Sequence, residues 1–214
     1  RMLRQLATLI ASSPHNLVAA GERAAVYQRH VREAVAVGDA LSPAPSSRWL
    51  DLGTGGGLPG LALAVCHPRV SWVLLDATRK KVLAVEAFAA NLGLDNVTAV
   101  HGRAEVIAHE LDARGQFDGV VARAVAPLGV LAELARGFLR PGGVLAAIKG
   151  PAWRQELAAV PSALKILRFA VVHGAELARV ERPTWLVTMR AVGDPPAGYP
   201  RRDGLPRRDP LGRP

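Results

Sequence analysis

The sequence predicts an α/β fold in which a mostly parallel sheet carries helices on both faces. Two observations predict it. Strand-like and helix-like segments alternate about five times between residues 48 and 148, and a run of glycines follows the first strand-like segment. A strand, a helix and a second parallel strand join through a right-handed crossover, so a series of such units forms a doubly wound sheet.

The elements of this alternation follow from the local pattern of apolar residues. Pro59 suits the first turn of a helix, while Thr78 and Gly93 suit the two ends of the next one. Pro141-Gly142-Gly143 predicts the turn into the last strand of the series. The expected strands are 48–52, 70–75, 96–100, 117–122 and 144–148, and the expected helices are 58–66, 79–92, 104–111 and 128–139.

Residues 1–47 are expected to form a short N-terminal helical extension. Within residues 3–41, apolar side chains recur at spacings of three and four, which is the spacing of one helix face. Pro14 and Gly21 should divide this helical stretch, because both residues interrupt helices.

Residues 48–192 are expected to form the α/β domain. Two further strands, at 164–172 and 185–192, would pair antiparallel through a long loop and bring the sheet to seven strands. Residues 193–214 are rich in Pro, Gly and Arg, so we expect a basic tail or an extended arm there.

The composition is that of a globular protein, with 50% hydrophobic residues in a chain of 214. Apolar runs fall short of the ~18 to 20 residues of a membrane span, and the first residues lack the apolar core of a signal peptide, although the chain does not begin with Met. The single cysteine, Cys66, excludes an internal disulfide and fits a reducing cytosol. We therefore expect a cytoplasmic monomer with no metal, since the histidines have no zinc-like spacing.

The chain is strongly basic, with a formal net charge of +9 and an isoelectric point of about 10.9. Such an excess favours a polyanionic partner, nucleic acid above all. Only four of the 27 basic residues are lysines, and arginine makes bidentate phosphate contacts and stacks on bases. GC-rich codon usage explains an arginine excess equally well, so charge alone leaves the partner open.

The glycine-rich turn at residues 53–57 indicates a ligand site, because ligands of open α/β sheets bind beyond the carboxyl ends of the strands. Two cofactors fit the turn. Residues 55–60 match G-x-G-x-x-G, the dinucleotide pattern, in which Asp76 would hold a ribose. Residues 51–57 match D-x-G-x-G-x-G, a pattern of class I methyltransferases, in which Asp51 meets the cationic amino-acid part of S-adenosylmethionine and Asp76 accepts both ribose hydroxyls. The glycines alone do not separate these two cofactors.

Motifs along most of the chain, from about Asn16 to Leu211, resemble those of the bacterial 16S ribosomal RNA (guanine-N7) methyltransferases, the GidB family. The Gly-Leu-Pro-Gly ending of the glycine turn and the Arg123-Ala124 pair are fairly specific to that family, whereas Asp-x-Gly-x-Gly and Pro-Gly-Gly occur in many methyltransferases. The matching stretches are residues 50–60, 75–81, 102–105, 122–128, 141–143, 149–151, 199–202 and 204–206.

This resemblance implies a Rossmann-like class I methyltransferase fold that binds S-adenosylmethionine. For Glu105 taken alone, an acid placed at a helix start by the helix dipole is the simpler interpretation. The motif and the resemblance together assign the cofactor site to Asp51, Gly53, Gly55, Gly57, Leu58, Asp76, Ala77, Thr78, Ala104, Glu105 and Arg123.

The expected chemistry is an in-line methyl transfer, in which the enzyme contributes position and electrostatics. Guanine N7 carries a lone pair at neutral pH and needs no general base, and the sequence shows no evident catalytic His or carboxylate pair. The residues after the fourth strand lack the Asn/Asp-Pro-Pro-aromatic motif of amine methylation, and Cys66 is expected in the core rather than as a nucleophile. Arg123 and Lys149 are the candidate catalytic residues, with structural salt bridges as the alternative.

We expect arginines near the last strand and in the C-terminal segment to bind ribosomal RNA. The family usually has Arg-His-Leu-Val where this chain has Thr184-Trp185-Leu186-Val187, so Arg182, two residues earlier, is the candidate replacement. The other candidates are Arg201, Arg202, Arg207 and Arg208, for which a solvated tail is the alternative.

The resemblance therefore predicts an enzyme that methylates guanine N7 in 16S ribosomal RNA or in the small ribosomal subunit. Two other functions stay open at the level of sequence. One is a methyltransferase for a small molecule or a protein, and the other is a non-catalytic module on the same fold that binds RNA or a nucleotide.

Overall fold

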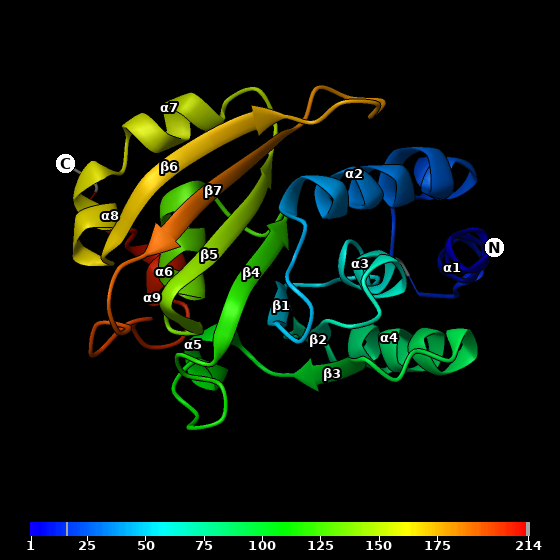
Figure 1. Ribbon diagram of the computed structural model, residues 1–214, viewed down its shortest axis with the longest axis horizontal. Helices are drawn as coiled ribbons and strands as arrows, with labels where there is room; N and C mark the ends of the chain where they lie inside the picture. Colours follow the sequence, from blue (N-terminus) through cyan, green and yellow to red (C-terminus); the bar gives the residue numbers. More distant parts are fainter. Residues whose placement is uncertain (16, 213–214) are drawn as a thin grey trace. The chain divides into compact units, whose positions relative to one another are not determined.

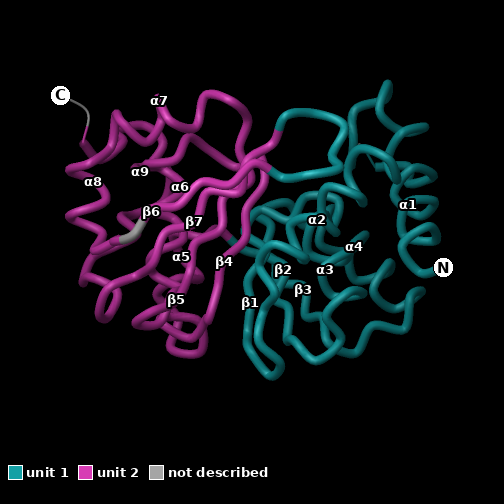
Figure 2. The backbone as a smooth tube through the Cα atoms, turned by 45° about the horizontal axis from the view of Figure 1, so that its top comes forward, with its two compact units in different colours: residues 1–102, 177–183 teal, residues 103–176, 184–214 magenta. Residues whose placement is uncertain are grey.

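The computed structural model describes residues 1–15 and 17–212, and the chain forms two compact units (Figure 2). The first unit contains Arg1–Gly102 and Leu177–Pro183, and the second contains Arg103–Glu176 and Thr184–Pro214. The N-terminal helical residues therefore cluster with the first half of the alternation. The C-terminal segment clusters with the second half.

The first unit has a parallel sheet of three strands in the order β3-β2-β1. These strands are β1 (Arg48–Leu52), β2 (Ser71–Asp76) and β3 (Val97–His101). Leu52 pairs with Leu75, so the carboxyl ends of β1 and β2 lie at the same edge. Trp49 and Trp72, whose ring centroids are 5.9 Å apart, pack together at the opposite ends of these strands.

Helices connect and cover these strands (Figure 1). The helix α3 (Gly60–Cys66) joins β1 to β2, and α4 (Arg79–Leu92) joins β2 to β3. Gly93 ends α4 in the left-handed conformation, with φ of 65°, as the sequence predicted. Thr78 is the N-cap residue of α4, but its hydroxyl makes no capping hydrogen bond.

The N-terminal region is helical with an interruption near Pro14, as expected. The helix α1 (Met2–Ser12) ends two residues before this proline and packs against α3 and α4. A 3-10 turn η1 (Ala20–Ala25) and a π turn η2 (Tyr27–Val31) lead into α2 (Arg32–Leu41).

The second unit has four strands in the order β4-β5-β7-β6. The first two, β4 (Phe117–Arg123) and β5 (Leu139–Lys149), are parallel. The last two, β6 (Phe169–Glu176) and β7 (Trp185–Ala191), pair antiparallel with each other, and β7 pairs antiparallel with β5. The seven expected strands and the mostly parallel arrangement are confirmed.

Short helices complete the second unit. They are α5 (Ala104–Ile107), α6 (Leu128–Arg136), α7 (Trp153–Ala158), α8 (Pro161–Ile166) and α9 (Leu205–Arg208). The third predicted helix therefore ends at Ile107 rather than at Leu111.

The predicted strand at 164–172 is wrong in its first half. Its first residues lie in α8, and the strand β6 starts only at Phe169. Pro161 occupies the first turn of α8, a position that proline favours, and Leu164 and Leu167 are buried three residues apart, which is a helical spacing.

The C-terminal segment is also more ordered than a tail. It contains α9, and side chains of the second unit hold it by hydrogen bonds, among them Arg114, Glu133 and Arg136. Arginines that donate to carbonyl oxygens give an irregular segment the backbone partners that a helix or sheet would otherwise supply.

Candidate functional site

The glycine-rich loop of the first unit folds back over the end of β2. The backbone N–H groups of Gly53 and Thr54 both donate to the carbonyl oxygen of Leu75, at 2.8 and 3.0 Å. Gly53, Gly55 and Gly57 all have positive φ, between 58° and 91°, a conformation that side chains with a Cβ rarely adopt. The sequence therefore uses glycine here because the loop must turn sharply at the carboxyl edge of the sheet.

Asp51 stabilises this loop through hydrogen bonds of its buried side chain. The side chain is buried, and its Oδ2 accepts hydrogen bonds from the Thr54 hydroxyl at 2.7 Å and from the Gly60 N–H at 2.8 Å. A Cβ on Gly60 would lie 2.6 Å from the same oxygen, so this glycine permits the contact. Asp51 thus joins the end of β1 to the first turn of α3, and its predicted contact with the cofactor stays a prediction.

Asp76 lies at the carboxyl end of β2 and is fixed by backbone on both sides. Its Oδ2 accepts from the Gly55 N–H at 2.9 Å, and its Oδ1 accepts from the Thr78 N–H at 2.8 Å. Each carboxylate oxygen can accept a further hydrogen bond, because a carboxylate has about four acceptor sites. Asp76 is therefore an oriented acceptor pair of the kind that the two hydroxyls of a ribose require.

The space beside this carboxylate is open. A Cβ on Gly55 would meet no atom closer than 3.9 Å, and Ala77 and Thr78 are exposed, whereas Leu58 is buried. An anionic acceptor pair next to an uncovered glycine turn fits the ribose and the cationic amino-acid part of S-adenosylmethionine. The residues of the first unit thus fit this cofactor.

One contact of the loop was missed by the sequence analysis. A Cβ on Gly56 would lie 2.8 Å from the Leu17 Cβ and 3.3 Å from the Leu17 carbonyl oxygen. The segment after α1 therefore packs directly on the glycine-rich loop. Only the choice of Gly at position 56, whose φ is not positive, could have signalled this close approach.

In the second unit, Ala104 and Glu105 begin α5, and both are buried. The Glu105 Oε1 accepts from the Gly204 N–H and from Arg103, each at 3.1 Å, and Arg103 also pairs with Asp203. Burial by itself raises the pKa of Glu105, but these hydrogen bonds and the Arg103 charge outweigh it, so the pKa lies below its ordinary value. Glu105 therefore ties the C-terminal segment to the start of α5.

Arg123 is the last residue of β4 and is half-buried. The next residue, Ala124, has φ of +55°, the left-handed region that costs a non-glycine residue roughly 1 kcal/mol or more. Such backbone is retained where the surrounding structure demands it, often at a functional site.

Lys149 ends β5, but its ammonium group is occupied. It donates to the Ala126 carbonyl oxygen at 2.8 Å and to the Glu156 carboxylate at 2.7 Å, and that carboxylate also accepts from the Leu128 N–H. Lys149 therefore braces the segment that follows Arg123. This is the structural salt bridge that the sequence analysis named as the alternative.

The candidate RNA-binding arginines differ in their surroundings. Arg201 donates to both oxygens of the fully buried Glu133, at 2.8 and 2.9 Å, which raises the pKa of Arg201, most strongly through these hydrogen bonds. Arg202, Arg207 and Arg208 are exposed, and Arg207 donates to the Val125 carbonyl oxygen.

In the first unit, Arg182 is 63% exposed and donates to the Glu22 carboxylate at 3.1 Å. Arg29 and His30 pair with the same glutamate. Burial alone would raise the pKa of Glu22, but the interactions with His30, followed by those with Arg182, lower it overall. The loop that carries Arg182 is thereby held on the N-terminal helical region.

Over residues 1–15 and 17–212, no three His, Cys, Asp or Glu side chains gather in a way that could hold a metal ion. Among the same residues, no helix is long and apolar enough to cross a membrane. Cys66 ends α3 and is half-buried, and burial, followed by the charge of Asp39, raises the pKa of its thiol.

Solved structures of other proteins share this fold. An S-adenosylmethionine-dependent O-methyltransferase of Thermotoga maritima superimposes with a TM-score of 0.54 at 16% identity, over 75% of this chain and 65% of that one. A putative rRNA methylase of Clostridium thermocellum does so with a TM-score of 0.55 at 17% identity, over 78% and 97%. These likenesses show that the chain has the Rossmann-like fold of class I methyltransferases, with the glycine-rich loop and Asp76 at the carboxyl edge of its sheet.

The sequence matches the family model GidB, described as rRNA small subunit methyltransferase G, over residues 2–193. Proteins named ribosomal RNA small subunit methyltransferase G are similar to it. That of Deinococcus deserti is 45% identical over 76% of this chain and 67% of its own length, and that of Moorella thermoacetica is 35% identical over 92% and 82%. The chain therefore belongs to the GidB family of methyltransferases, and its cofactor is S-adenosylmethionine rather than a dinucleotide.

Proposed function

We propose that this enzyme transfers a methyl group to N7 of a guanine in 16S ribosomal RNA, acting as a monomer in the bacterial cytoplasm. The observation that supports this most is the family match over residues 2–193, combined with an Asp76 carboxylate oriented for a ribose. When bound, S-adenosylmethionine supplies an electrophilic methyl group.

The residues of this site bind and orient the cofactor and the guanine, and they do not transfer protons. Asp76 accepts the ribose hydroxyls, and the glycine-rich loop lets the cofactor approach the backbone. Guanine N7 is nucleophilic at neutral pH, so the transfer requires alignment and not a general base. The two candidate residues at the ends of β4 and β5 are cations, Arg123 and Lys149, which agrees with a reaction that needs no base.

Arg123 is the residue that we assign to orientation of the guanine, because its planar guanidinium can stack on a base. Lys149 is a positioning residue, since its contacts with Ala126 and Glu156 fix the segment after Arg123. The exposed arginines at positions 182, 202, 207 and 208 are assigned to RNA phosphates. Arg201 is left out of this set because Glu133 occupies its guanidinium.

The test is methyl transfer from labelled S-adenosylmethionine to a panel of acceptors. Free 16S RNA and intact small subunits from a strain without this methyltransferase are compared with large-subunit RNA and with total cell protein and metabolites. We expect label in 16S RNA or in small subunits, and the better of these two identifies the natural substrate. Label confined to protein or metabolites would contradict the proposal, and so would cofactor binding without transfer to any acceptor.

A further inference from the structure

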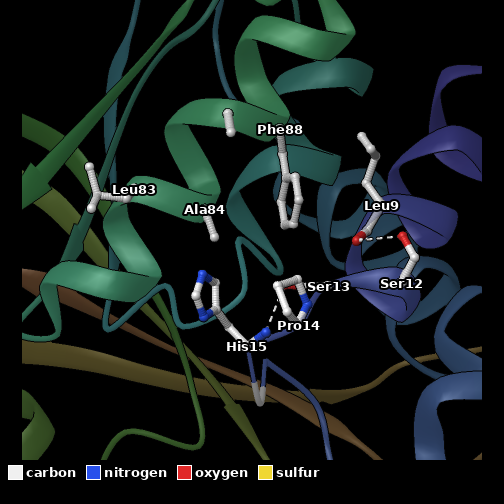
Figure 3. A pocket seen from close by; sticks show the side chains of 9 residues that line it. Leu9, Ser12, Ser13, Pro14, His15, Leu83, Ala84 and Phe88 are labelled. Carbon is white, nitrogen blue, oxygen red and sulfur yellow. Dashed lines mark hydrogen bonds between the residues drawn. The ribbon is translucent and has the colours of Figure 1, made fainter.

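The first unit contains an open cavity of about 330 Å³ beside α4, apart from the glycine-rich loop (Figure 3). It lies between the last turn of α1, residues 13–15 and one face of α4. In Figure 3 the rings of Pro14 and His15 lie across from Ala84 and Phe88. The volume is within the range of small-ligand pockets, which are mostly apolar with a few polar groups.

The lining of this cavity suits a flat aromatic ring with a polar edge. Leu83 and Phe88 of α4 offer apolar surface, and Leu83 is 52% exposed although it is a large hydrophobic residue. Ser12 and the exposed His15 add a hydroxyl and an imidazole. The lining residues include no carboxylate, so nothing among them repels an anion.

The two ends of the cavity differ. At one end α1 and α4 are tied together by a hydrogen bond of 2.9 Å from the Gln5 Nε2 to the Asn91 Oδ1. The other end faces the first turn of α4, where Arg79 and Lys80 are exposed. These residues precede Leu83 and Ala84 by four positions and therefore lie on the same helix face as the cavity.

The residues that line the cavity are close in sequence to the candidate cofactor-binding segments of this unit. Residues 13–15 line it, and two residues further on Leu17 packs on Gly56 of the glycine-rich loop. On the other side, α4 begins immediately after Thr78, whose N–H is held by Asp76. One short stretch of chain on each side therefore joins the cavity to the loop that binds the methyl donor.

From this arrangement we propose that the cavity binds an unstacked nucleobase of the RNA substrate. The base packs against Leu83 and Phe88, its polar edge meets His15 and Ser12, and its flanking phosphates lie on Arg79 and Lys80. Single-stranded RNA is commonly held in this way, with bases on ring and apolar surfaces and the backbone on cations. The inference rests on the proposed function, because it takes RNA to be the substrate.

Two substitutions test the cavity from opposite directions. Ala87→Phe fills the cavity with a larger side chain from an exposed position of α4. Leu83→Ala instead removes an apolar side chain that lines the cavity. Binding of free 16S RNA should weaken about tenfold in each variant, while the dependence of affinity on salt stays unchanged because no phosphate contact is lost.

In contrast, Lys80→Ala should reduce the slope of log affinity against log salt concentration by about one unit, because it removes one phosphate contact. Glu86→Ala, on the same helix but outside the lining, is the matched control and should bind RNA like the unsubstituted protein.

The affinity for S-adenosylmethionine should be the same in all of these variants, which also verifies that they fold. RNA affinity that is unchanged in both Ala87→Phe and Leu83→Ala would overturn the proposal. So would variants that bind and methylate free RNA normally but lose activity on the assembled subunit, because the cavity would then hold a side chain of a ribosomal protein. A wild-type enzyme that binds 16S RNA but methylates none of it would contradict the proposed function alone, since the binding measurement still reports on the cavity.

Discussion

At the scale of single residues, the two acids at the strand ends have different tasks that their sequence positions do not reveal. Asp51 is the second-last residue of β1 and Asp76 the last of β2, both beside the glycine-rich loop, and the sequence assigned both to the cofactor. In the structure both side chains are buried, Asp51 at 1% and Asp76 at 8% exposed. One oxygen of Asp51 accepts from Thr54 and Gly60, whereas Asp76 is oriented by backbone N–H groups beside the uncovered Gly55. The same residue type therefore braces the loop in one place and presents acceptors in the other.

This difference predicts opposite effects of substitution. Asp76→Ala should weaken S-adenosylmethionine binding by about one to two orders of magnitude, because loss of a charged acceptor costs roughly 1.5 to 3 kcal/mol. Asp51→Ala should instead lower the melting temperature, since the Gly60 N–H and the Thr54 hydroxyl lose a buried partner. Calorimetric titration and thermal unfolding of both variants measure the two effects. Equal cofactor affinity in Asp76→Ala and the unsubstituted enzyme would move the ribose contact elsewhere.

Arg123 allows a second prediction at this scale. If its guanidinium orients the guanine, kcat should remain low in Arg123→Ala at saturating cofactor, because the lost interaction is made mainly in the transition state. Arg123→Lys keeps the charge and removes the plane, so it should also be impaired. The measurement is kcat and KM for RNA and for cofactor in both variants. Full activity of Arg123→Lys would show that charge alone is needed, and the stacking role would be wrong.

At the scale of elements, the alternation of strands and helices could be predicted from the sequence, while the C-terminal segment could not. The helix Arg79–Leu92 and the strand Arg48–Leu52 have the predicted boundaries because apolar periodicity and end signals agree there. The run from Leu164 onward is mostly apolar, interrupted by Lys165 and Arg168, and such a run does not distinguish a helix from a strand. Its helical first half is set by Pro161 and by packing.

The C-terminal segment depends on contacts with residues far away in the sequence. Arg136 is fully buried and donates to the carbonyl oxygens of three consecutive residues, 192–194. Arg114 donates in the same way to the carbonyl oxygens of Pro196 and Tyr199. Such partners exist only once the chain has folded, so the local composition resembles that of a solvated tail. Burial, followed by the charges of Arg168 and Arg114, lowers the pKa of Arg136 to about 10, which still leaves it protonated at neutral pH.

A stability prediction belongs to this element. Arg201→Ala should reduce the free energy of unfolding by about 3 kcal/mol, because it removes the charged partner of the fully buried Glu133 and leaves that side chain only the backbone N–H of residue 201. Arg202→Ala is the matched control, an exposed neighbour whose loss should change stability by less than about 0.5 kcal/mol. Urea unfolding of the two variants measures the difference. If the two were equally stable, the C-terminal segment would not be anchored through Glu133.

The contact between Glu105 and Gly204 should make this anchoring sensitive to acid. The pKa of Glu105 is lower in the folded state than its ordinary value near 4.5, so the stabilisation is complete above about pH 4.5. It is lost as the pH falls through the lower, folded-state pKa. Thermal unfolding between pH 3 and 6 should therefore show Glu105→Gln less stable than the unsubstituted protein at pH 6, with the two converging at the acid end. A constant difference across this range would contradict a role for the charge.

At the scale of the whole molecule, the basic charge and the family match support the same partner, but not all of the charge is available to it. Arg136, Arg114 and Arg201 hold the protein's own carbonyl oxygens or a buried glutamate, so the net charge of +9 overstates the cations that can meet RNA. Cations that remain on the surface include Arg182, the exposed arginines of the C-terminal segment, and Arg79 and Lys80 in the first turn of α4. The charge does not identify the reaction, which is defined by the substrate atom that receives the methyl group.

The most direct test of the account is to locate that atom. A bacterial strain that lacks its own GidB-family gene is complemented with this chain, and nucleosides from its 16S RNA are analysed by mass spectrometry against an uncomplemented control. The account predicts that 7-methylguanosine absent from the control returns with the chain, and that it does not return with the Arg123→Ala variant. A methyl group on any other atom of the RNA, or no gain of methylation while the protein is present and folded, would contradict it.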